Sequence, residues 1–276
     1  MSDPLFDVAG QVVLVTGGSR GIGRAIAQGF ADRGATVVVV SRDAESLAKA
    51  AQEMAGQGGN VVPIAGDVSS VDQLVRVVVR CRNEVGEIDT LVNVAGVNRR
   101  KPALDVTEDD YDYILDINLK GAFFLSQAVG REMVRRGKGC QINIASLNSD
   151  RPLTNVLPYA ISKAAIVQMT RALAAEWGGR GVRVNAIAPG FVLTDLTRKL
   201  WSDPTMQAWG QANTPQRRLG VPDDMVGAAI FLASQAATFM TGQTIYVDGG
   251  FTAGWAWPIP ADGGQPVQVA PTHEKS

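Results

Sequence analysis

Short runs of β-branched and other apolar residues alternate along this chain with longer segments of helical periodicity. The run Val37–Val40 is apolar at every position, which indicates a strand that is buried on both faces. A repeated order of strand and helix predicts an α/β fold, a doubly wound and mostly parallel sheet of seven strands with helices on both faces. We expect strands at Val12–Thr16, Thr36–Val40, Val61–Ala65, Thr90–Val94, Gln141–Ala145, Arg183–Ala188 and Thr244–Val247. We expect helices at Ile22–Arg33, Ala44–Met54, Val71–Asn83, Glu108–Arg136, Tyr159–Trp177 and Asp223–Ser234.

Residues 1–276 are expected to form a single domain. Their number suits one hydrophobic core, and no internal repeat or linker divides them. Two segments break the alternation of strand and helix. The segment at about 191–219 carries Pro204 and Pro215, and we expect it to be a substrate-loop insertion that covers the site. The segment at about 251–276 is rich in Gly and Pro and is expected to be a C-terminal tail.

Charge and hydropathy exclude several classes of partner. The net charge is −1 and charged residues make up 19%, so neither nucleic acid nor an anionic membrane is an expected partner. No stretch approaches the ~18 unbroken apolar residues of a membrane-spanning helix. The start Met1–Pro4 lacks the basic and apolar segments of a secretory signal, so a cytoplasmic protein is expected.

Histidine and cysteine are scarce, which restricts the chemistry further. The single histidine, His273, lies in the polar end of the chain, so a Ser-His-Asp hydrolase, a His-based dehydrogenase and a His-rich metal site are excluded, and no metal is expected. Cys81 and Cys140 have neither metal-ligand nor disulfide spacing, and we expect both in the core.

A glycine-rich turn follows the first expected strand directly and opens the first helix. Gly17, Gly21 and Gly23 give the spacing G-x-x-x-G-x-G. Glycines let the backbone turn tightly and approach a pyrophosphate, and the helix N-terminus offers free N–H groups and a positive dipole potential. This position favours dinucleotide binding over the alternative of a merely structural turn.

The form T-G-x-x-x-G-I-G resembles the nucleotide-binding turn of the short-chain dehydrogenase/reductase family. The resemblance implies a Rossmann fold, a nicotinamide cofactor, interconversion of a ketone and a secondary alcohol, and a homotetramer. The chain departs from the family pattern at Val94, where a second Asn is common, which puts the role of the Asn pair in doubt. Further matches follow in the family's order over roughly residues 8–250: Gly66-Asp67-Val68, Asn93-Val94-Ala95-Gly96, Asn118, Ser146, Tyr159-x-x-x-Lys163, Pro189-Gly190-x-x-x-Thr194 and Tyr246-Val247-Asp248-Gly249-Gly250.

Ser146, Tyr159 and Lys163 are the candidate catalytic residues, together with Asn118. Ketone reduction needs a hydride and a proton for the developing alkoxide, and a phenol with an ordinary pKa near ~10 exchanges protons poorly at neutral pH. Lys163 lies on the same helix face as Tyr159, and its charge favours the phenolate. Ser146 follows a strand end and can hydrogen-bond the substrate oxygen. The resemblance implies that Asn118 positions a water that links Lys163 to solvent, against the alternative of a polar residue in a helix kink.

The cofactor is predicted to be NADP(H). In an NAD enzyme of this fold an acidic residue ends the second strand, whereas here Ser41 stands there and Arg42 follows. Arg20 can approach the same ribose, which offers two guanidiniums to one 2′-phosphate. The alternative is that Asp43 is the ribose acid, although capping of the next helix suits Asp43 better. With the contacts that the resemblance implies, the cofactor-binding candidates are Gly17, Ser19, Arg20, Gly21, Ile22, Arg42, Asp67, Val68, Tyr159, Lys163, Pro189, Gly190, Val192 and Thr194.

The resemblance implies that the loops after the fourth, fifth and sixth strands face the substrate, and the first two supply the candidate ligands. They are polar and basic, which suits a hydroxylated carboxylate, although the arginines can equally form a solvated rim. The segments 97–102 and 249–254 are similar to those of the gluconate 5-dehydrogenase group of sugar-acid and polyol dehydrogenases. A 3-oxoacyl-[acyl carrier protein] reductase is the alternative enzyme, and a non-catalytic NADP(H)-binding sensor or scaffold is an alternative of another class, which the intact Ser–Tyr–Lys set disfavours. The loops carry Asn98, Arg99, Arg100, Asn148, Arg151 and Asn155, of which Asn98, Arg99 and Arg151, with Ser146, are the predicted substrate-binding residues.

The expected homotetramer rests on the resemblance, which implies a four-helix interface between the fourth and fifth helices. Ala122-Phe123-Phe124 and Ile166-Val167-Met169 offer apolar residues beyond one core-facing stripe. The segment Trp255–Pro258 is expected near a neighbouring active site.

Overall fold

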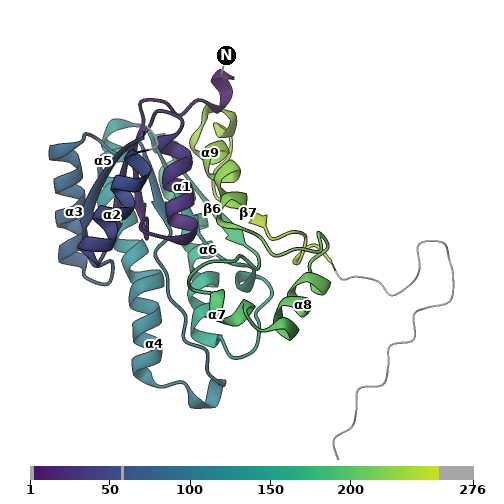
Figure 1. Cartoon of the computed structure of the whole chain (residues 1–276). Coiled ribbons are helices and arrows are strands. Elements are labelled where there is room, and N and C mark those ends of the chain that lie inside the picture. Colours follow the sequence, from purple (N-terminus) through teal and green to yellow (C-terminus); the bar gives the residue numbers. More distant parts are fainter. Residues whose placement is uncertain (1–2, 57–58, 255–276) are drawn as a thin grey trace, which may run out of the picture.

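The computed structural model describes residues 3–56 and 59–254 (Figure 1). Its centre is a sheet of seven strands, all parallel, in the order β3-β2-β1-β4-β5-β6-β7. This order confirms the doubly wound fold, and each strand begins and ends within two residues of its expected bounds. The strands are β1 (Val12–Thr16), β2 (Thr36–Ser41), β3 (Asn60–Ala65), β4 (Thr90–Asn93), β5 (Gly139–Ile144), β6 (Val182–Pro189) and β7 (Thr244–Val247).

Helices cover both faces of the sheet, and the strands β1 and β2 bury apolar side chains on both sides. Val13 and Val15 of β1 lie in the core that α1, α2 and α9 complete, whereas Leu14 lies in the core formed with α3, α5 and α6. Successive side chains of a strand point to opposite faces, so one apolar run supplies both cores. The helices are α1 (Gly21–Ala31), α2 (Ala44–Ala55), α3 (Val71–Glu84), α4 (Glu108–Leu115), α5 (Gly121–Arg136), α6 (Leu157–Trp177), α7 (Arg198–Trp201), α8 (Pro204–Asn213) and α9 (Val226–Ala233).

The expected single helix over Glu108–Arg136 is wrong. A π turn, Asp116–Lys120, separates α4 from α5. This turn contains Asn118, whose side chain is buried and hydrogen-bonded to the loop after β4. One extra residue per turn is characteristic of π bulges, which are frequent at functional sites. The helical periodicity of the sequence does not show where a single extra residue is inserted into the helix.

The segment 191–219 contains α7 and α8, which an aromatic cluster holds on the domain. The Phe191 ring lies 5.2 Å from the Trp201 ring and 4.8 Å from the Phe251 ring, measured between centroids. Leu147, just after β5, and Leu219 complete this buried cluster. The beginning of the expected tail is therefore part of the core, while the Trp255–Pro258 segment lies outside the described residues.

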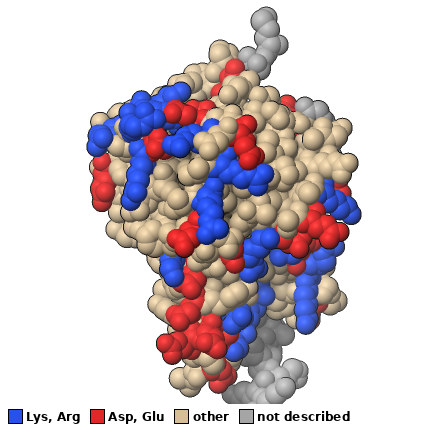
Figure 2. Space-filling model, turned by 90° about the vertical axis from the view of Figure 1, so that its left-hand side faces the viewer, with Lys and Arg blue, Asp and Glu red and all other residues tan. Residues whose placement is uncertain are grey.

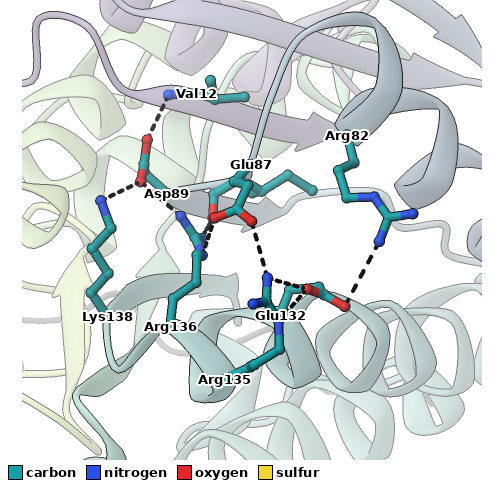
Figure 3. Close-up of polar contacts among 9 residues, drawn as sticks. Val12, Arg82, Glu87, Asp89, Glu132, Arg135, Arg136 and Lys138 are labelled. Atoms are coloured by element: carbon teal, nitrogen blue, oxygen red, sulfur yellow. Dashed lines mark hydrogen bonds and ion pairs between the residues drawn. The ribbon is translucent and has the colours of Figure 1, made fainter.

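Ion pairs cover the amino edge of the sheet, opposite to the ends where such folds bind ligands (Figure 3). The Asp89 carboxylate accepts a hydrogen bond from Val12 N at 3.1 Å and pairs with Arg136 at 3.3 Å. It also pairs with Lys138 at 3.5 Å, and Glu87 pairs with Arg136 at 3.0 Å. Since Arg136 ends α5, these contacts join the end of that helix to the starts of β1 and β4.

The surface over α3, α4 and α5 carries charges of both signs. Figure 2 shows Lys and Arg interleaved with Asp and Glu over the upper part of this face, and mainly Asp and Glu at its lower end. Among the described residues, every helix is too short or too polar to span a membrane.

Both cysteines are buried, as expected, and burial raises the pKa of the Cys81 thiol to about 11. The described residues contain no group of three or more His, Cys, Asp or Glu side chains that could hold a metal ion.

Candidate active site

A cleft of about 290 Å³ opens at the carboxyl ends of the strands. It extends across the point where the strand order reverses between β1 and β4, which is where doubly wound sheets bind ligands. Most of the predicted site residues line this cleft, although they come from distant parts of the chain. They are Gly17, Ser19, Arg20, Gly21, Ile22, Arg42, Val68, Ser146, Tyr159, Lys163, Pro189, Gly190, Val192 and Thr194.

The glycine turn between β1 and α1 depends on the absence of side chains. Gly17 has φ +68°, in the left-handed region that favours glycine. A Cβ on Gly23 would lie 2.3 Å from the Gly17 carbonyl oxygen, so no larger residue fits there. The first turn of α1 has neither an acidic residue nor a side-chain cap. Its N–H groups are therefore available to an anion in the cleft.

The residues near the end of β2 that were candidates for binding the ribose have different surroundings. Asp43 caps α2, because its carboxylate accepts a hydrogen bond from Ser46 N at 2.7 Å, and its contacts with Ser46 lower the pKa of that carboxyl. Arg20 and Arg42 both line the cleft. No described residue forms an ion pair or hydrogen bond with either guanidinium. Two arginines without ion-pair partners among the described residues thus line the cleft, while the nearby Asp43 caps α2.

Ser146 and Tyr159 meet at the other end of the cleft. Ser146 follows β5 and is 5% exposed, and its hydroxyl accepts a hydrogen bond from Asn148 N at 3.1 Å. Tyr159 lies in the first turn of α6. Burial raises the pKa of the Tyr159 phenol, whereas its hydrogen bond with Ser146 and the positive charge of Arg100 lower it. The phenol is therefore placed where neighbouring groups control its proton affinity.

Lys163 lies one helical turn after Tyr159, on the same side of α6. Its ammonium group is 5.8 Å from the centroid of the Tyr159 ring and donates a hydrogen bond to the Ile144 carbonyl at 2.7 Å. Burial lowers the pKa of Lys163 to about 8, because an ammonium ion loses hydration in the interior. The lysine reaches the cleft between the end of β5 and the phenol.

Asn118 stands behind the cleft, among backbone groups of the loop after β4. Its amide nitrogen donates to the Val97 carbonyl at 3.0 Å and to the Ser162 hydroxyl at 3.1 Å. Its amide oxygen accepts from Val97 N at 2.8 Å. The Ser162 hydroxyl in turn donates to the Tyr159 carbonyl at 2.7 Å. Asn118 therefore joins the loop after β4 to the turn of α6 that carries the phenol.

Two further residues of the family pattern have local bonds. Asp67 accepts hydrogen bonds from the backbone and hydroxyl of Ser69, at 2.9 and 2.8 Å, and so shapes the turn before α3. Asn93 donates to Asn143 and to Ser126, each at 2.9 Å, in the buried interior. The Asn93 side chain therefore links β4 to β5 and α5 even though Val94 replaces the second Asn.

The predicted substrate ligands Asn98, Arg99 and Arg151 are not among the residues that line the cleft. Arg99 pairs with Asp110 at 3.0 Å, and its guanidinium lies 4.0 Å from the centroid of the Tyr113 ring. The Asn98 amide oxygen is buried without a hydrogen-bond partner among the described residues. The backbone N–H of Arg151 donates to the Leu147 carbonyl at 2.9 Å. Arg99 thus supports the loop. Its neighbour Arg100 is the arginine whose positive charge lowers the pKa of Tyr159.

Two threonines that the sequence pattern did not single out hold the cleft loops. The Thr16 hydroxyl, at the end of β1, accepts hydrogen bonds from Val94 N at 3.0 Å and Ala95 N at 3.2 Å. The Thr197 hydroxyl donates to the Val192 carbonyl at 2.6 Å and accepts from Thr194 N at 2.9 Å. The spacing of Thr197 three residues after Thr194 was a usable signal, because hydroxyls often bond to backbone groups a few residues away.

Comparison with known proteins gives a consistent set of relatives. Residues 17–252 match the family model described as enoyl-(acyl carrier protein) reductase. Gluconate 5-dehydrogenase of Gluconobacter oxydans is 39% identical over 253 residues, which cover 91% of this chain and 99% of that protein. D-threitol dehydrogenase of Mycolicibacterium smegmatis is 41% identical over 247 residues, which cover 90% of this chain and 95% of that protein.

A solved structure agrees with these relatives. The crystal structure of a gluconate 5-dehydrogenase from Burkholderia cenocepacia J2315, in complex with NADP and tartrate, matches this fold with a TM-score of 0.88. The two chains are 38% identical, and the match covers 91% of this chain and 98% of that one.

Proposed function

Because the chain belongs to the short-chain dehydrogenase/reductase family, we propose that it interconverts a ketone and a secondary alcohol on a sugar acid or a polyol. It is an oxidoreductase of CH–OH groups that uses NADP(H). One observation carries the proposal: Ser146, Tyr159 and Lys163 converge in the same cleft as the glycine turn and two uncompensated arginines. A carbonyl group bound beside Tyr159 would lie next to a proton donor and within the cofactor cleft.

The residues of the cleft fit NADP(H). The glycine turn and the α1 N-terminus would hold the pyrophosphate, since a Cβ on Gly23 would close the turn. Arg20 and Arg42 would hold the 2′-phosphate through charge-assisted hydrogen bonds. Val68 would contact the adenine, and Val192 and Thr194 would bind the carboxamide and pyrophosphate sides.

The reaction uses the phenol as acid and base. NADP(H) supplies or accepts the hydride. In ketone reduction Tyr159 donates its proton to the developing alkoxide, and in alcohol oxidation the phenolate takes that proton back. Ser146 hydrogen-bonds the substrate oxygen and holds it beside the phenol. Lys163 would bind the ribose and favour the phenolate, and Asn118 would order the proton path behind the lysine.

A sugar acid is the favoured substrate because of Arg100. Arg100 lies exposed in the loop after β4, outside the residues that line the cleft, and its positive charge is one of the influences that lower the pKa of Tyr159. No described residue forms an ion pair with it. A carboxylate is the natural partner for such a guanidinium. The gluconate 5-dehydrogenase relatives act on a molecule of that chemistry, as their name states.

A substrate panel tests the proposal. Purified protein is mixed with NADPH and a keto sugar acid such as 5-keto-gluconate, a neutral ketose, or a β-ketoacyl thioester, and the absorbance of NADPH is followed. We expect the highest kcat/KM with the keto sugar acid. Preference for the thioester would instead identify a 3-oxoacyl-[acyl carrier protein] reductase. NADPH binding without turnover of any of the three would identify a sensor or scaffold.

A further inference from the structure

The Thr197 hydroxyl connects two residues of the segment that follows β6. Its oxygen lies 2.6 Å from the Val192 carbonyl oxygen and 2.9 Å from Thr194 N. It also lies 3.1 Å from the Thr194 hydroxyl oxygen, a distance across which either hydroxyl could donate. Val192, Thr194 and Thr197 all line the cofactor cleft. The hydroxyl of Thr197 therefore bonds to two neighbours that the cleft presents to the cofactor.

The number of available hydrogens fixes the direction of the bond between the two hydroxyls. A threonine hydroxyl has one hydrogen to donate and two lone pairs that accept. A carbonyl oxygen only accepts, so the hydrogen of Thr197 goes to the Val192 carbonyl, which is nearer at 2.6 Å than the Thr194 carbonyl at 3.3 Å. The Thr194 N–H occupies one lone pair of the Thr197 oxygen. The other lone pair accepts from the Thr194 hydroxyl, whose oxygen is then left with lone pairs only.

The Thr194 side chain turns apolar atoms toward the glycine turn. A Cβ placed on Gly21 would lie 3.6 Å from both the Cβ and the Cγ2 of Thr194. A pyrophosphate held at that turn offers acceptor oxygens, which need a donor. A primary carboxamide offers N–H groups, which need an acceptor. The hydroxyl oxygen of Thr194, with its hydrogen committed to Thr197, therefore suits the carboxamide and not the pyrophosphate.

Val192 offers the complementary group. Its two neighbours in the chain form the bridge to Gly220: Leu193 N donates to the Gly220 carbonyl at 2.9 Å, and Gly220 N donates to the Phe191 carbonyl at 2.8 Å. No described residue accepts a hydrogen bond from Val192 N. A carboxamide has one acceptor oxygen and one donor nitrogen. A free N–H on Val192 and an acceptor oxygen on Thr194 match these two groups.

We propose that Thr197 is a positioning residue for the cofactor: by accepting the hydroxyl hydrogen of Thr194, it fixes Thr194 as the acceptor for the carboxamide N–H of NADP(H). This inference rests on the proposed function, in which Val192 and Thr194 bind the carboxamide and pyrophosphate sides, and it assigns the Thr194 hydroxyl to the carboxamide. The hydrogen and both lone pairs of the Thr197 hydroxyl are already used, so its effect passes through Thr194.

Binding of cofactor analogues to the purified protein tests the inference without turnover. NADP⁺ is compared with its 3-acetylpyridine analogue, which keeps the carbonyl and has a methyl group in place of the amide nitrogen. A third probe, 2′-phospho-ADP-ribose, keeps the pyrophosphate and lacks the nicotinamide. Dissociation constants are measured by calorimetry for the wild type, Thr197→Val and Thr197→Ser. Thr205→Val is the matched control, because it makes the same change at an exposed position of α8.

We expect the wild type to bind NADP⁺ about fivefold more tightly than the acetylpyridine analogue, which is the effect of one hydrogen bond. Thr197→Val should raise the Kd of NADP⁺ about fivefold and leave the Kd of the analogue and of 2′-phospho-ADP-ribose within about twofold. Thr197→Ser keeps the hydroxyl and should keep the wild-type preference, as should Thr205→Val. Should Thr197→Val not fold, Thr197→Ala removes the same hydroxyl and carries the same expectation.

A merely structural role of Thr197 predicts a different result, because a loosened segment weakens NADP⁺ and its analogue alike. Equal losses on these two ligands, a parallel loss on 2′-phospho-ADP-ribose, or a wild type without preference for NADP⁺ would each overturn the inference. Thr194→Val should also abolish the preference, and the double variant should show no further loss if Thr197 acts through Thr194. A wild type that shows the preference but reduces no compound of the substrate panel would instead overturn the proposed function and leave this inference standing.

Discussion

Opposing influences from its surroundings act on the pKa of the Tyr159 phenol. Burial alone favours the neutral phenol, and the Ser146 hydroxyl and Arg100 favour the phenolate. Lys163, four residues later, is itself so buried that its pKa falls to about 8. At the residue scale, then, proton transfer depends on a balance between desolvation and a few placed charges.

Replacement of Tyr159 by Phe should abolish turnover and spare cofactor binding. The phenol alone carries the transferred proton, and general acid–base catalysis typically contributes ~10²–10⁴ in rate. We expect kcat to fall at least about 100-fold, with the NADPH Kd unchanged in a fluorescence titration. Tyr111→Phe, at an exposed position, is the control and should keep full activity. A Tyr159→Phe enzyme that retained more than about a tenth of kcat would exclude the assigned role.

Arg42 should determine the preference for NADPH over NADH. Charge-assisted hydrogen bonds contribute ~1.5–3 kcal/mol each, so Arg42→Gln is expected to weaken NADPH binding about 10–150-fold and to leave NADH binding almost unchanged. Arg42→Asp should go further and repel the 2′-phosphate. The measurement is kcat/KM for both cofactors.

The matched control for Arg42 is Arg24→Gln, because Arg24 already pairs with Glu53 at 2.8 Å. Its cofactor ratio should equal that of the wild type. An unchanged ratio in the Arg42 variants would show that this arginine does not contact the 2′-phosphate.

At the scale of the elements, the π turn between α4 and α5 is the local irregularity on which the site depends. It places Asn118 between the loop after β4 and α6, and the same loop carries Arg100. A regular helix would rotate the residues after the insertion by about 100° and remove the amide from Val97.

Asn118→Ala should lower both stability and activity. It leaves the partly buried N–H and carbonyl of Val97 without this partner, which together should cost about 1–3 kcal/mol. We expect a loss of unfolding free energy in that range by urea denaturation, together with a lower kcat at the working temperature. Asn60→Ala removes one exposed hydrogen bond to Thr36 and serves as the control. If Asn118→Ala matched the Asn60→Ala stability, the organising role of the amide would be contradicted.

At the scale of the whole molecule, the exposed apolar side chains differ from those expected. Ala122, Ile166, Val167 and Met169 are buried in the chain's own core, at 2–9% exposure, so the expectation that they are spare apolar residues is wrong. Of the expected residues Phe123 is exposed, at 40%, and Leu157 at 48% and Ile161 at 41% are exposed on α6. Exposed apolar side chains favour association where they meet on one surface.

The homotetramer therefore remains a prediction, with Phe123 and Ile161 as its interface residues. Light scattering at micromolar concentration should give about four times the 29.2 kDa of one chain. Phe123→Glu with Ile161→Glu should reduce that mass, because buried unpaired charges are costly in an apolar interface. Val79→Glu, an exposed position on α3, is the control and should leave it unchanged. A monomeric wild type would refute the tetramer.

The sequence by itself determined the features that depend on local pattern. Short β-branched and continuous apolar runs predicted seven strands, and the glycine spacing predicted an anion site at the first helix. The Ser146–Tyr159–Lys163 set followed from one strand end and one helix face. The strands, the turn and the shared cleft are confirmed because a strand buries both faces, a turn needs its glycines, and residues four apart on a helix lie together, while the anion-binding and catalytic roles stay predictions.

Only the tertiary structure decided which contacts are made by residues that look alike in the sequence. Arg99 and Arg100 are equivalent in the sequence, and only the packing of α4 against the loop pairs Arg99 with Asp110 and leaves Arg100 exposed. The π turn at Asn118 and the burial of Ile166 likewise depend on partners far along the chain. The physical reason is common to all three. An ion pair, a buried amide and a covered apolar side chain are stabilised by neighbours that only folding brings into contact, and the local sequence pattern does not show which residues those neighbours are.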